Sequence, residues 1–507
     1  MESFDLLMHG FSVALSPQNL MLAFVGCLLG TLMGALPGLG PVNGVAILIP
    51  VTFTLGLPPV AALILLVSVY YGTMYGGRIS SIMLNIPGDE PAVMTTLDGY
   101  PMAQQGRAAA ALAISAVASF VGATAATIGL TLFAPVLVGF AIHFGPAEYF
   151  ALFMLAFLTV GGVTGRNPAK TLLAATIGLA IGTVGLDPAT GVERYTFGLF
   201  ELYDGIDFIA ALVGLFAISE FLVFLEERKD RQSQPRLLVG SLKGALKELP
   251  ATWWTMARGS VIGFVSGVLP GAGASLGSFL SYVLERRWLG KRGRFGTGDP
   301  RGVAAPEAGN NAAAAGSLVP MLSLGIPGSG TTAILLALLL SLNITPGPLL
   351  FEREPDLVWG LIAALYIGNV MLLILNLPLV GLFTRVLGLP YWLLMPLVVM
   401  VSFVGVYSLN NNPFDLYLMI GFGVFGYLLR KLDISLVPVV LGLLLGNSME
   451  FNLRRALSIS GGEWGILGAS GISIGLYALA GVMVAAGIAV ALVRQRGEKT
   501  GGGFEGP

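Results

Sequence analysis

Long stretches without a charged side chain constrain this chain most. No Asp, Glu, Lys or Arg occurs in residues 6–77, 108–147, 259–284, 308–351 or 464–493. A helix needs about 20 apolar residues to cross a hydrocarbon core of about 30 Å. Only 11% of the residues are charged, whereas soluble domains carry about 25%. We therefore expect an all-α polytopic membrane protein with roughly 10–12 transmembrane helices.

The composition also excludes several classes of function. The formal net charge of −1 gives no reason to expect binding to nucleic acid. Cys27 is the only cysteine, and His9 and His143 are the only histidines, so we expect neither a disulfide nor a metal site. The sequence has no nucleophile triad and no phosphate loop. We therefore expect no enzyme, no ATPase and no cofactor, with transport driven by an ion gradient.

A Pro-Gly motif occurs twice in similar surroundings. Residues 34–44 read GALPGLGPVNG, and residues 267–277, displaced by 233 positions, read GVLPGAGASLG. A second pair, GGRISSIMLNIPG at 76–88 and GSLVPMLSLGIPG at 316–328, is displaced by 240 positions. A weaker Asn-Pro pair follows, with Pro168 and Pro413 displaced by 245 positions. Collinear matches of this kind predict two structural repeats.

The charge pattern predicts how the repeats lie in the membrane. Thirteen of the 27 Lys and Arg residues fall in 228–301, and positive loops stay in the cytoplasm. The segment 259–284 would then enter and leave on one side, as a re-entrant hairpin with its tip at Pro270. The first copy, near Pro37, has no positive N-terminal flank, so we expect inverted repeats. The predicted parts are a first membrane repeat (1–226), a charged cytoplasmic linker (227–258), a second membrane repeat (259–462), an extra C-terminal transmembrane helix (463–493) and a disordered tail (494–507).

Paired breaks inside apolar runs indicate a binding site. Proline removes a backbone donor, and glycine allows turns that other residues avoid. Broken helices are tolerated at membrane depth only where protein or a watery cavity covers the freed backbone groups. Such breaks in both halves of a transporter mark its substrate and ion sites. The alternative reading is that these prolines kink helices and these glycines permit close packing.

The breaks and their flanking segments supply small donors and acceptors for a substrate or an ion. Half-helix N-termini suit an anion, and unwound carbonyl groups suit Na⁺. The candidate substrate- and ion-binding residues are Pro37, Gly38, Gly40, Asn43, Asn85, Pro87, Gly88, Pro270, Gly271, Gly273, Ser275, Asn310, Asn311, Ser323, Pro327, Gly328, Ser329, Thr331 and Thr332.

Four charged residues near the motifs are candidates for charge roles. Arg78 could bind a substrate carboxylate with two hydrogen bonds or anchor a cytoplasmic helix end. Asp89 and Glu90 could bind a cation, pair with Arg78 or lie in an aqueous loop. Glu307 stands in APEAGNNAAAAG (305–316), where two adjacent amides precede an apolar run and would be costly to bury without partners.

Several of these segments resemble the large membrane subunit of tripartite tricarboxylate transporters, the TctA family. The likeness rests on 34–44, 70–93, 160–170, 267–277 and 302–335, and extends over about residues 16–460. Matched to the family pattern, the glycine-rich breaks fall on Pro37–Gly40 and Pro270–Gly273. The Ile-Pro-Gly pair falls on Ile86–Gly88 and Ile326–Gly328, and the PEAGNNA motif falls on Pro306–Ala312.

The resemblance implies a function and partners that composition does not show. The chain would work with a small TctB-like membrane subunit and a periplasmic TctC-like solute-binding protein in a bacterial inner membrane. It would import an organic di- or tricarboxylate, such as citrate, by symport with Na⁺ or H⁺. The substrate would sit between the two hairpin tips near the bilayer midplane. A channel and a polytopic membrane enzyme are the rival readings.

Overall fold

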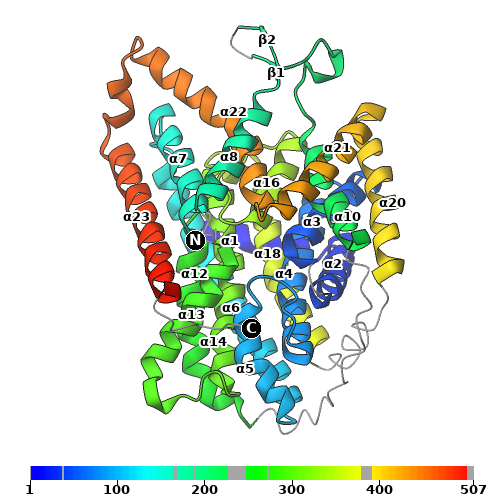
Figure 1. Cartoon of the computed structure of the whole chain (residues 1–507), viewed down its shortest axis with the longest axis vertical. Coiled ribbons are helices and arrows are strands. Elements are labelled where there is room, and N and C mark those ends of the chain that lie inside the picture. Colours follow the sequence, from blue (N-terminus) through cyan, green and yellow to red (C-terminus); the bar gives the residue numbers. More distant parts are fainter. Residues whose placement is uncertain are drawn as a thin grey trace.

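Helices make up nearly all of the computed structural model, which describes residues 2–36, 39–163, 168–187, 190–226, 247–270, 273–377 and 391–499. Among the described residues, sheet is confined to one short antiparallel pair, β1 (Gly185–Leu186) with β2 (Glu193–Arg194). This pair stands at one end of the helical bundle, opposite the end that holds α5, α13 and α14 (Figure 1).

Several helices of the N-terminal part, among them α2 and α4, carry proline in the first turn, where its missing N–H group leaves no intrahelical bond unmade. Its elements are α1 (Glu2–Ala14), α2 (Pro17–Ala35), α3 (Gly40–Thr54), α4 (Pro59–Leu84), α5 (Val93–Gln104), α6 (Ala108–Ala141), α7 (Pro146–Val163), α8 (Pro168–Gly182), η1 (Phe200–Leu202), α9 (Phe208–Val213), the π-helical η2 (Gly214–Ile218) and α10 (Ser219–Glu226).

The C-terminal part follows the gap at 227–246. Its elements are η3 (Leu249–Thr252), α12 (Trp253–Val268), α13 (Gly273–Leu289), η4 (Gly290–Arg292), α14 (Pro300–Gly316), α15 (Leu318–Leu324), α16 (Gly330–Ser341), α17 (Leu350–Arg353), α18 (Pro355–Asn376), α20 (Tyr391–Asn410), α21 (Pro413–Lys431), α22 (Leu436–Ile459), η5 (Trp464–Gly468) and α23 (Gly471–Lys499).

Within the described ranges, six stretches of helix are long and apolar enough to cross a membrane: α2, α4, α6, the continuous Phe208–Glu226 segment, α18 and α22. Shorter apolar segments, among them α3, α16 and Gly471–Ala485 of α23, accompany them. The expectation of an all-α polytopic membrane protein is therefore confirmed. The two repeats, their inversion and the domain boundaries remain predictions, and most of the predicted linker lies outside the described residues.

Both Pro-Gly motifs interrupt the helical path. α2 ends at Ala35 and α3 begins at Gly40, while α12 ends at Val268 and α13 begins at Gly273. Gly40 and Gly273 both have positive φ, at 57° and 64°, which suits glycine and strains other residues. α12 and α13 pack on each other and on α14 as a helical hairpin, whereas α3 packs mainly on α4 and α20.

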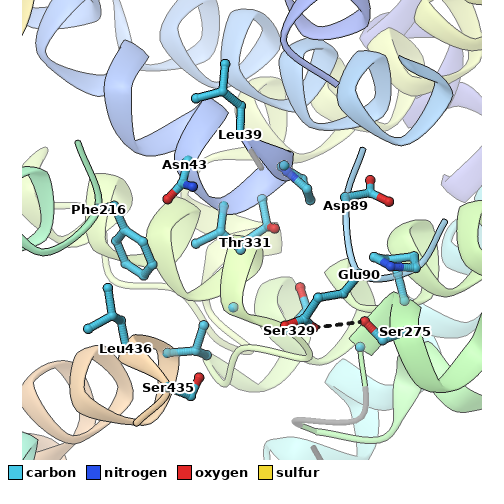
Figure 2. A pocket seen from close by; sticks show the side chains of 18 of the residues that line it. Leu39, Asn43, Asp89, Glu90, Phe216, Ser275, Ser329, Thr331, Ser435 and Leu436 are labelled. Carbon is cyan, nitrogen blue, oxygen red and sulfur yellow. Dashed lines mark hydrogen bonds between the residues drawn. The ribbon is translucent and has the colours of Figure 1, made fainter. Parts of the chain in front are cut away.

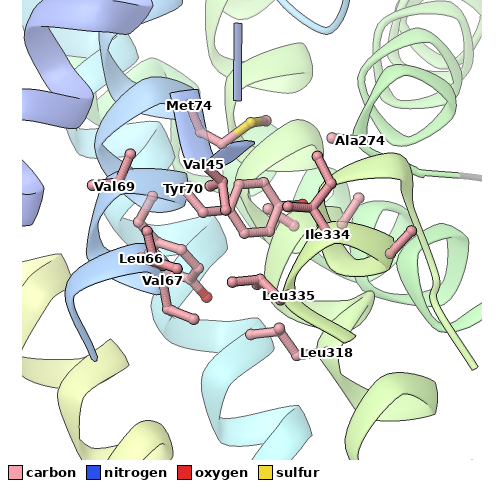
Figure 3. Close-up of a cluster of buried hydrophobic side chains, with 14 of the residues drawn as sticks. Val45, Leu66, Val67, Val69, Tyr70, Met74, Ala274, Leu318, Ile334 and Leu335 are labelled. Atoms are coloured by element: carbon pink, nitrogen blue, oxygen red, sulfur yellow. The ribbon is translucent and has the colours of Figure 1, made fainter. Parts of the chain in front are cut away.

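The apolar core lies directly beside the broken segments. Figure 3 shows side chains from α3, α4, α13, α15 and α16 in one cluster, including Val45, Leu66, Ala274, Leu318 and Ile334. Elements on either side of both breaks therefore share one packed interior, which holds the broken ends in fixed positions.

Candidate functional site

The broken ends open onto one cavity of about 540 Å³. Figure 2 shows Asn43, Phe216, Thr331 and Leu436, from four separate segments, around the same space. The core residues Tyr70, Met74 and Ala274 also belong to its wall, so the apolar cluster supports the cavity directly. A cavity of this size can hold a small organic ion.

Five helices begin at the cavity wall. Their first residues, or the residues just before them, line it: Gly40–Asn43 of α3, Glu90–Val93 before and in α5, Gly273–Ser275 of α13, Ser329–Thr331 of α16 and Ser435–Pro438 of α22. A helix start presents N–H groups that have no partner within the helix, together with the positive end of the helix dipole. Several such ends around one cavity produce a positive potential that favours an anion.

Capping by the side chain of the N-cap residue differs among these helix starts. No side chain of the flanking N-cap residue caps α3, α5 or α22 in the described structure. α16 differs because Ser329 and Thr332 form a reciprocal capping box. The anion-binding capacity of the cavity therefore rests mainly on the other helix starts.

Three charged residues line the cavity. Glu90 is exposed and accepts a hydrogen bond of 3.3 Å from the Ser275 hydroxyl, a contact between the two halves that Figure 2 also draws. Arg430, at the end of α21, forms an ion pair with Glu220, while its buried Nε has no partner among the described residues. Asp89 is held in the loop before α5, where its Oδ1 accepts a 2.9 Å hydrogen bond from the Ala92 N–H.

The structure brings many of the predicted site residues to this cavity. Those that line it are Gly40, Asn43, Pro87, Gly88, Asp89, Glu90, Gly273, Ser275, Pro327, Ser329 and Thr331. Those outside its wall are Arg78, Asn85, Pro270, Glu307, Asn310, Asn311, Ser323, Gly328 and Thr332. The remaining three, Pro37, Gly38 and Gly271, fall outside the described residues.

Arg78 and Glu307 form a separate buried network. Arg78 is 1% exposed and donates to the Ser119 hydroxyl at 2.9 Å, and that hydroxyl donates to Glu307 at 3.0 Å. Thr95 also donates to Glu307, at 2.6 Å, and the Arg78 guanidinium lies over the Tyr75 ring. In this structure the Arg78 guanidinium is enclosed by the network and does not line the cavity, and its predicted roles as a substrate ligand or a helix-end anchor remain predictions.

The two adjacent amides of α14 belong to the same interior. Asn311 donates to the side-chain oxygen of Asn310 at 2.5 Å and to the backbone oxygen of Glu307 at 3.1 Å. Both amides are 1% exposed, so their polar groups are satisfied inside the protein. Their expected contact with substrate would require a conformation other than this one.

Sequence reasoning missed several cavity residues: Tyr70, Thr171, Phe216, Arg430 and Ser435. Arg430 stands at the end of an apolar helix beside Lys431, where the pattern resembles an ordinary cytoplasmic helix end. The fold places α21 and α22 next to the broken helices, and no local pattern in the sequence predicts that contact.

The model of the tripartite tricarboxylate transporter TctA family matches residues 20–441. An uncharacterized 52.8 kDa protein in the TAR-I ttuC' 3' region of Agrobacterium vitis is 42% identical over 454 residues, 90% of each chain. An uncharacterized protein in the TAR-II ttuC' 3' region of the same organism is 43% identical over 222 residues, which are 44% of this chain and 92% of that relative. No solved structure matches. The chain belongs to the tripartite tricarboxylate transporter TctA family and is a membrane transporter component.

Proposed function

We propose that this chain imports an organic di- or tricarboxylate, such as citrate, through the cavity between its broken helices. The observation that carries the proposal is the convergence of five helix starts on one cavity. Their N–H groups can bind carboxylate oxygens directly, and their dipoles offset the negative charge of the substrate. The polar side chains of Asn43, Ser275 and Thr331 add hydrogen-bonding groups to the same wall.

Transport would be secondary and cation-coupled, with Na⁺ or H⁺ as the driving ion. Family membership supports a tripartite assembly, with a TctB-like small membrane subunit and a periplasmic TctC-like binding protein delivering the substrate. The site of action would be the inner membrane of a bacterium. Alternating access would move the segments that carry the helix breaks against the surrounding helices.

Uptake by vesicles that contain the chain, its small subunit and the cognate binding protein tests this proposal. We expect saturable accumulation of labelled carboxylate that requires the binding protein and stops when the cation gradient is removed. Uptake that equilibrates without a gradient would instead fit the channel reading, and it would overturn the proposal.

A variant pair tests the cavity itself. Thr331→Val removes a hydroxyl from the cavity wall at the start of α16, while the matched Thr176→Val removes one from an exposed position of α8. We expect Thr331→Val to raise the apparent KM for the carboxylate about tenfold, the loss of roughly one hydrogen bond to a charged group. Thr176→Val should keep the wild-type KM. Equal KM values in both variants would remove the cavity from the transport path.

A further inference from the structure

Asp89 is half-buried in the cavity wall, and one oxygen of its carboxylate is buried without a partner among the described residues. Its Oδ2 has no hydrogen-bond partner among the described residues, whereas Oδ1 is bound by the Ala92 N–H. The carboxylate lies against α4 at Gly77, where an added Cβ would be 2.9 Å from Cγ and from both oxygens. A residue with a side chain at position 77 would therefore occupy the space that this carboxylate fills.

Among the residues that the structure describes, no positive side chain acts on Asp89. The charged side chains that act on it are those of Glu90, in the same loop, and Glu307, from α14, and both are acidic. The nearby hydroxyl of Tyr70 from α4 is neutral, and α2 and α3 contain no charged residue. Arg430, on the cavity wall, is already paired with Glu220. A buried carboxylate oxygen without a partner is costly, and a bound proton or metal cation at Oδ2 would offset that cost.

The corresponding position in the C-terminal half is closed with neutral groups. Ser329 lies 240 residues after Asp89, and Ser317 lies 240 residues after Gly77. The Ser329 hydroxyl is satisfied by the Thr332 N–H at 3.2 Å and approaches the Ser317 hydroxyl at 3.5 Å. Of these two corresponding positions, only the one in the N-terminal half has a carboxylate oxygen without a partner among the described residues. This difference would give the cavity one cation site rather than two.

A helix-end carbonyl lies beside the same loop. The loop residue Gly88, next to Asp89 in the chain, lies against the Gly34 carbonyl in the last turn of α2. Carbonyl groups at the ends of broken helices are common ligands of Na⁺ in secondary transporters. The loop therefore holds an unpaired carboxylate oxygen one residue away from a contact with a helix-end carbonyl, next to a cavity whose helix starts favour an anion.

We propose that Asp89 holds the coupling cation, a proton or Na⁺, and that this cation must bind before the anionic substrate binds with high affinity. The proposal rests on the proposed function. Without the cation, the charge of Asp89 opposes a carboxylate in the cavity whose wall it forms; with the cation, that repulsion is removed. Because binding free energies are reciprocal, the substrate tightens cation binding by the same factor.

The test compares Asp89→Asn and Asp89→Ser with Asp204→Asn, which alters an exposed carboxylate in the loop before α9. Asp89→Asn mimics the neutralised state, and Asp89→Ser copies Ser329. In reconstituted vesicles the wild type should show an apparent KM for the carboxylate that falls at least tenfold as the cation concentration rises. Both Asp89 variants should keep exchange of labelled for unlabelled carboxylate at a KM independent of the cation, and should lose gradient-driven accumulation. Asp204→Asn should behave as the wild type.

Two further measurements identify the cation. Stabilisation of the purified wild type against thermal unfolding by Na⁺ but not K⁺, absent in both Asp89 variants, would assign Na⁺. A KM that depends on pH in K⁺ medium, with that dependence lost in both variants, would assign a proton. Cation-driven accumulation that survives in Asp89→Asn or Asp89→Ser would overturn the proposal. A wild type that transports no carboxylate would refute the proposed function instead, while the thermal measurement would still decide whether Asp89 binds a cation.

Discussion

The crossing of α2 with α4 and the crossing of α12 with α14 use the same contacts. In each, three glycines at intervals of four residues lie so close to the facing helix that an added Cβ would meet its backbone oxygens. In the first crossing, Gly26 faces Leu65, Gly30 faces Val69 and Gly34 faces Thr73. In the second crossing, Gly259 faces Ala305, Gly263 faces Gly309 and Gly267 faces Ala313. Every glycine is displaced by 233 positions and every facing residue by 240, the displacements of the two sequence motifs.

The charged residues of the buried network, in contrast, have no charged counterparts at the corresponding positions of the other half. The position that corresponds to Arg78 is Leu318, and the position that corresponds to Glu307 is Val67. Small residues set the close approach of two helices, so the shared glycines account for the shared backbone geometry. The charged residues differ between the two crossings, and each can be replaced by the residue at the corresponding position of the other half.

The largest expected effect comes from replacing the charged residues of the buried network, Arg78 and Glu307, with the neutral residue types found at the corresponding positions of the other half. Arg78→Leu or Glu307→Val alone leaves the other charge buried without its partner, and each should lower the free energy of unfolding by about 3–5 kcal/mol. The double variant removes both charges and should recover much of that loss. Thermal and chemical unfolding in detergent would measure the coupling; additive losses would show that the network is not a unit.

The next effect probes the shared crossings. Gly30→Ala and Gly263→Ala each place a Cβ against the backbone of the facing helix. Each should lower the free energy of unfolding by about 2–3 kcal/mol, at the upper end of overpacking costs. Gly421→Ala is the control, because an added Cβ there meets no heavy atom within 4 Å. A large difference between Gly30→Ala and Gly263→Ala would break the correspondence between the two crossings.

A smaller effect is expected at the two breaks. Gly40 and Gly273 have positive φ, while an added Cβ has ordinary room at both, with Asp89 or Ser329 3.7 Å away. Strain alone should cost about 1 kcal/mol in each alanine variant. Asparagine tolerates this backbone conformation, so Gly40→Asn and Gly273→Asn should unfold at higher denaturant concentrations than the alanine variants. Equal stability of the alanine and asparagine variants would contradict this account.

The sequence predicted the helical membrane fold and both breaks for clear physical reasons. Charge-free runs can only be membrane segments, and Pro-Gly pairs cannot continue a helix. The same logic placed Gly40, Asn43, Gly273 and Thr331 near a site, and all four line the cavity.

The rest depends on contacts that no local pattern contains. The amides of α14 stood next to an apolar run in the sequence, but the fold turns them toward Glu307 and away from the cavity. Arg430 and Phe216 reach the cavity only because α21 and η2 pack together and lie near the broken helices. Long-range packing decides these positions, and local periodicity carries no information about it.

The smallest net effect tests whether the second half can be copied into the first. Gly77→Ser alone would crowd the Asp89 carboxylate and should cost about 1–2 kcal/mol of unfolding free energy. Gly77→Ser combined with Asp89→Ser recreates the hydroxyl pair of Ser317 and Ser329, and it removes the unsatisfied carboxylate oxygen. The double variant should therefore unfold within about 0.5 kcal/mol of the wild type, as measured by denaturant titration. A double variant as unstable as Gly77→Ser alone would mean that the two loops differ in backbone as well as in side chains. The correspondence between the halves would then be limited to the two helix crossings that the glycines form.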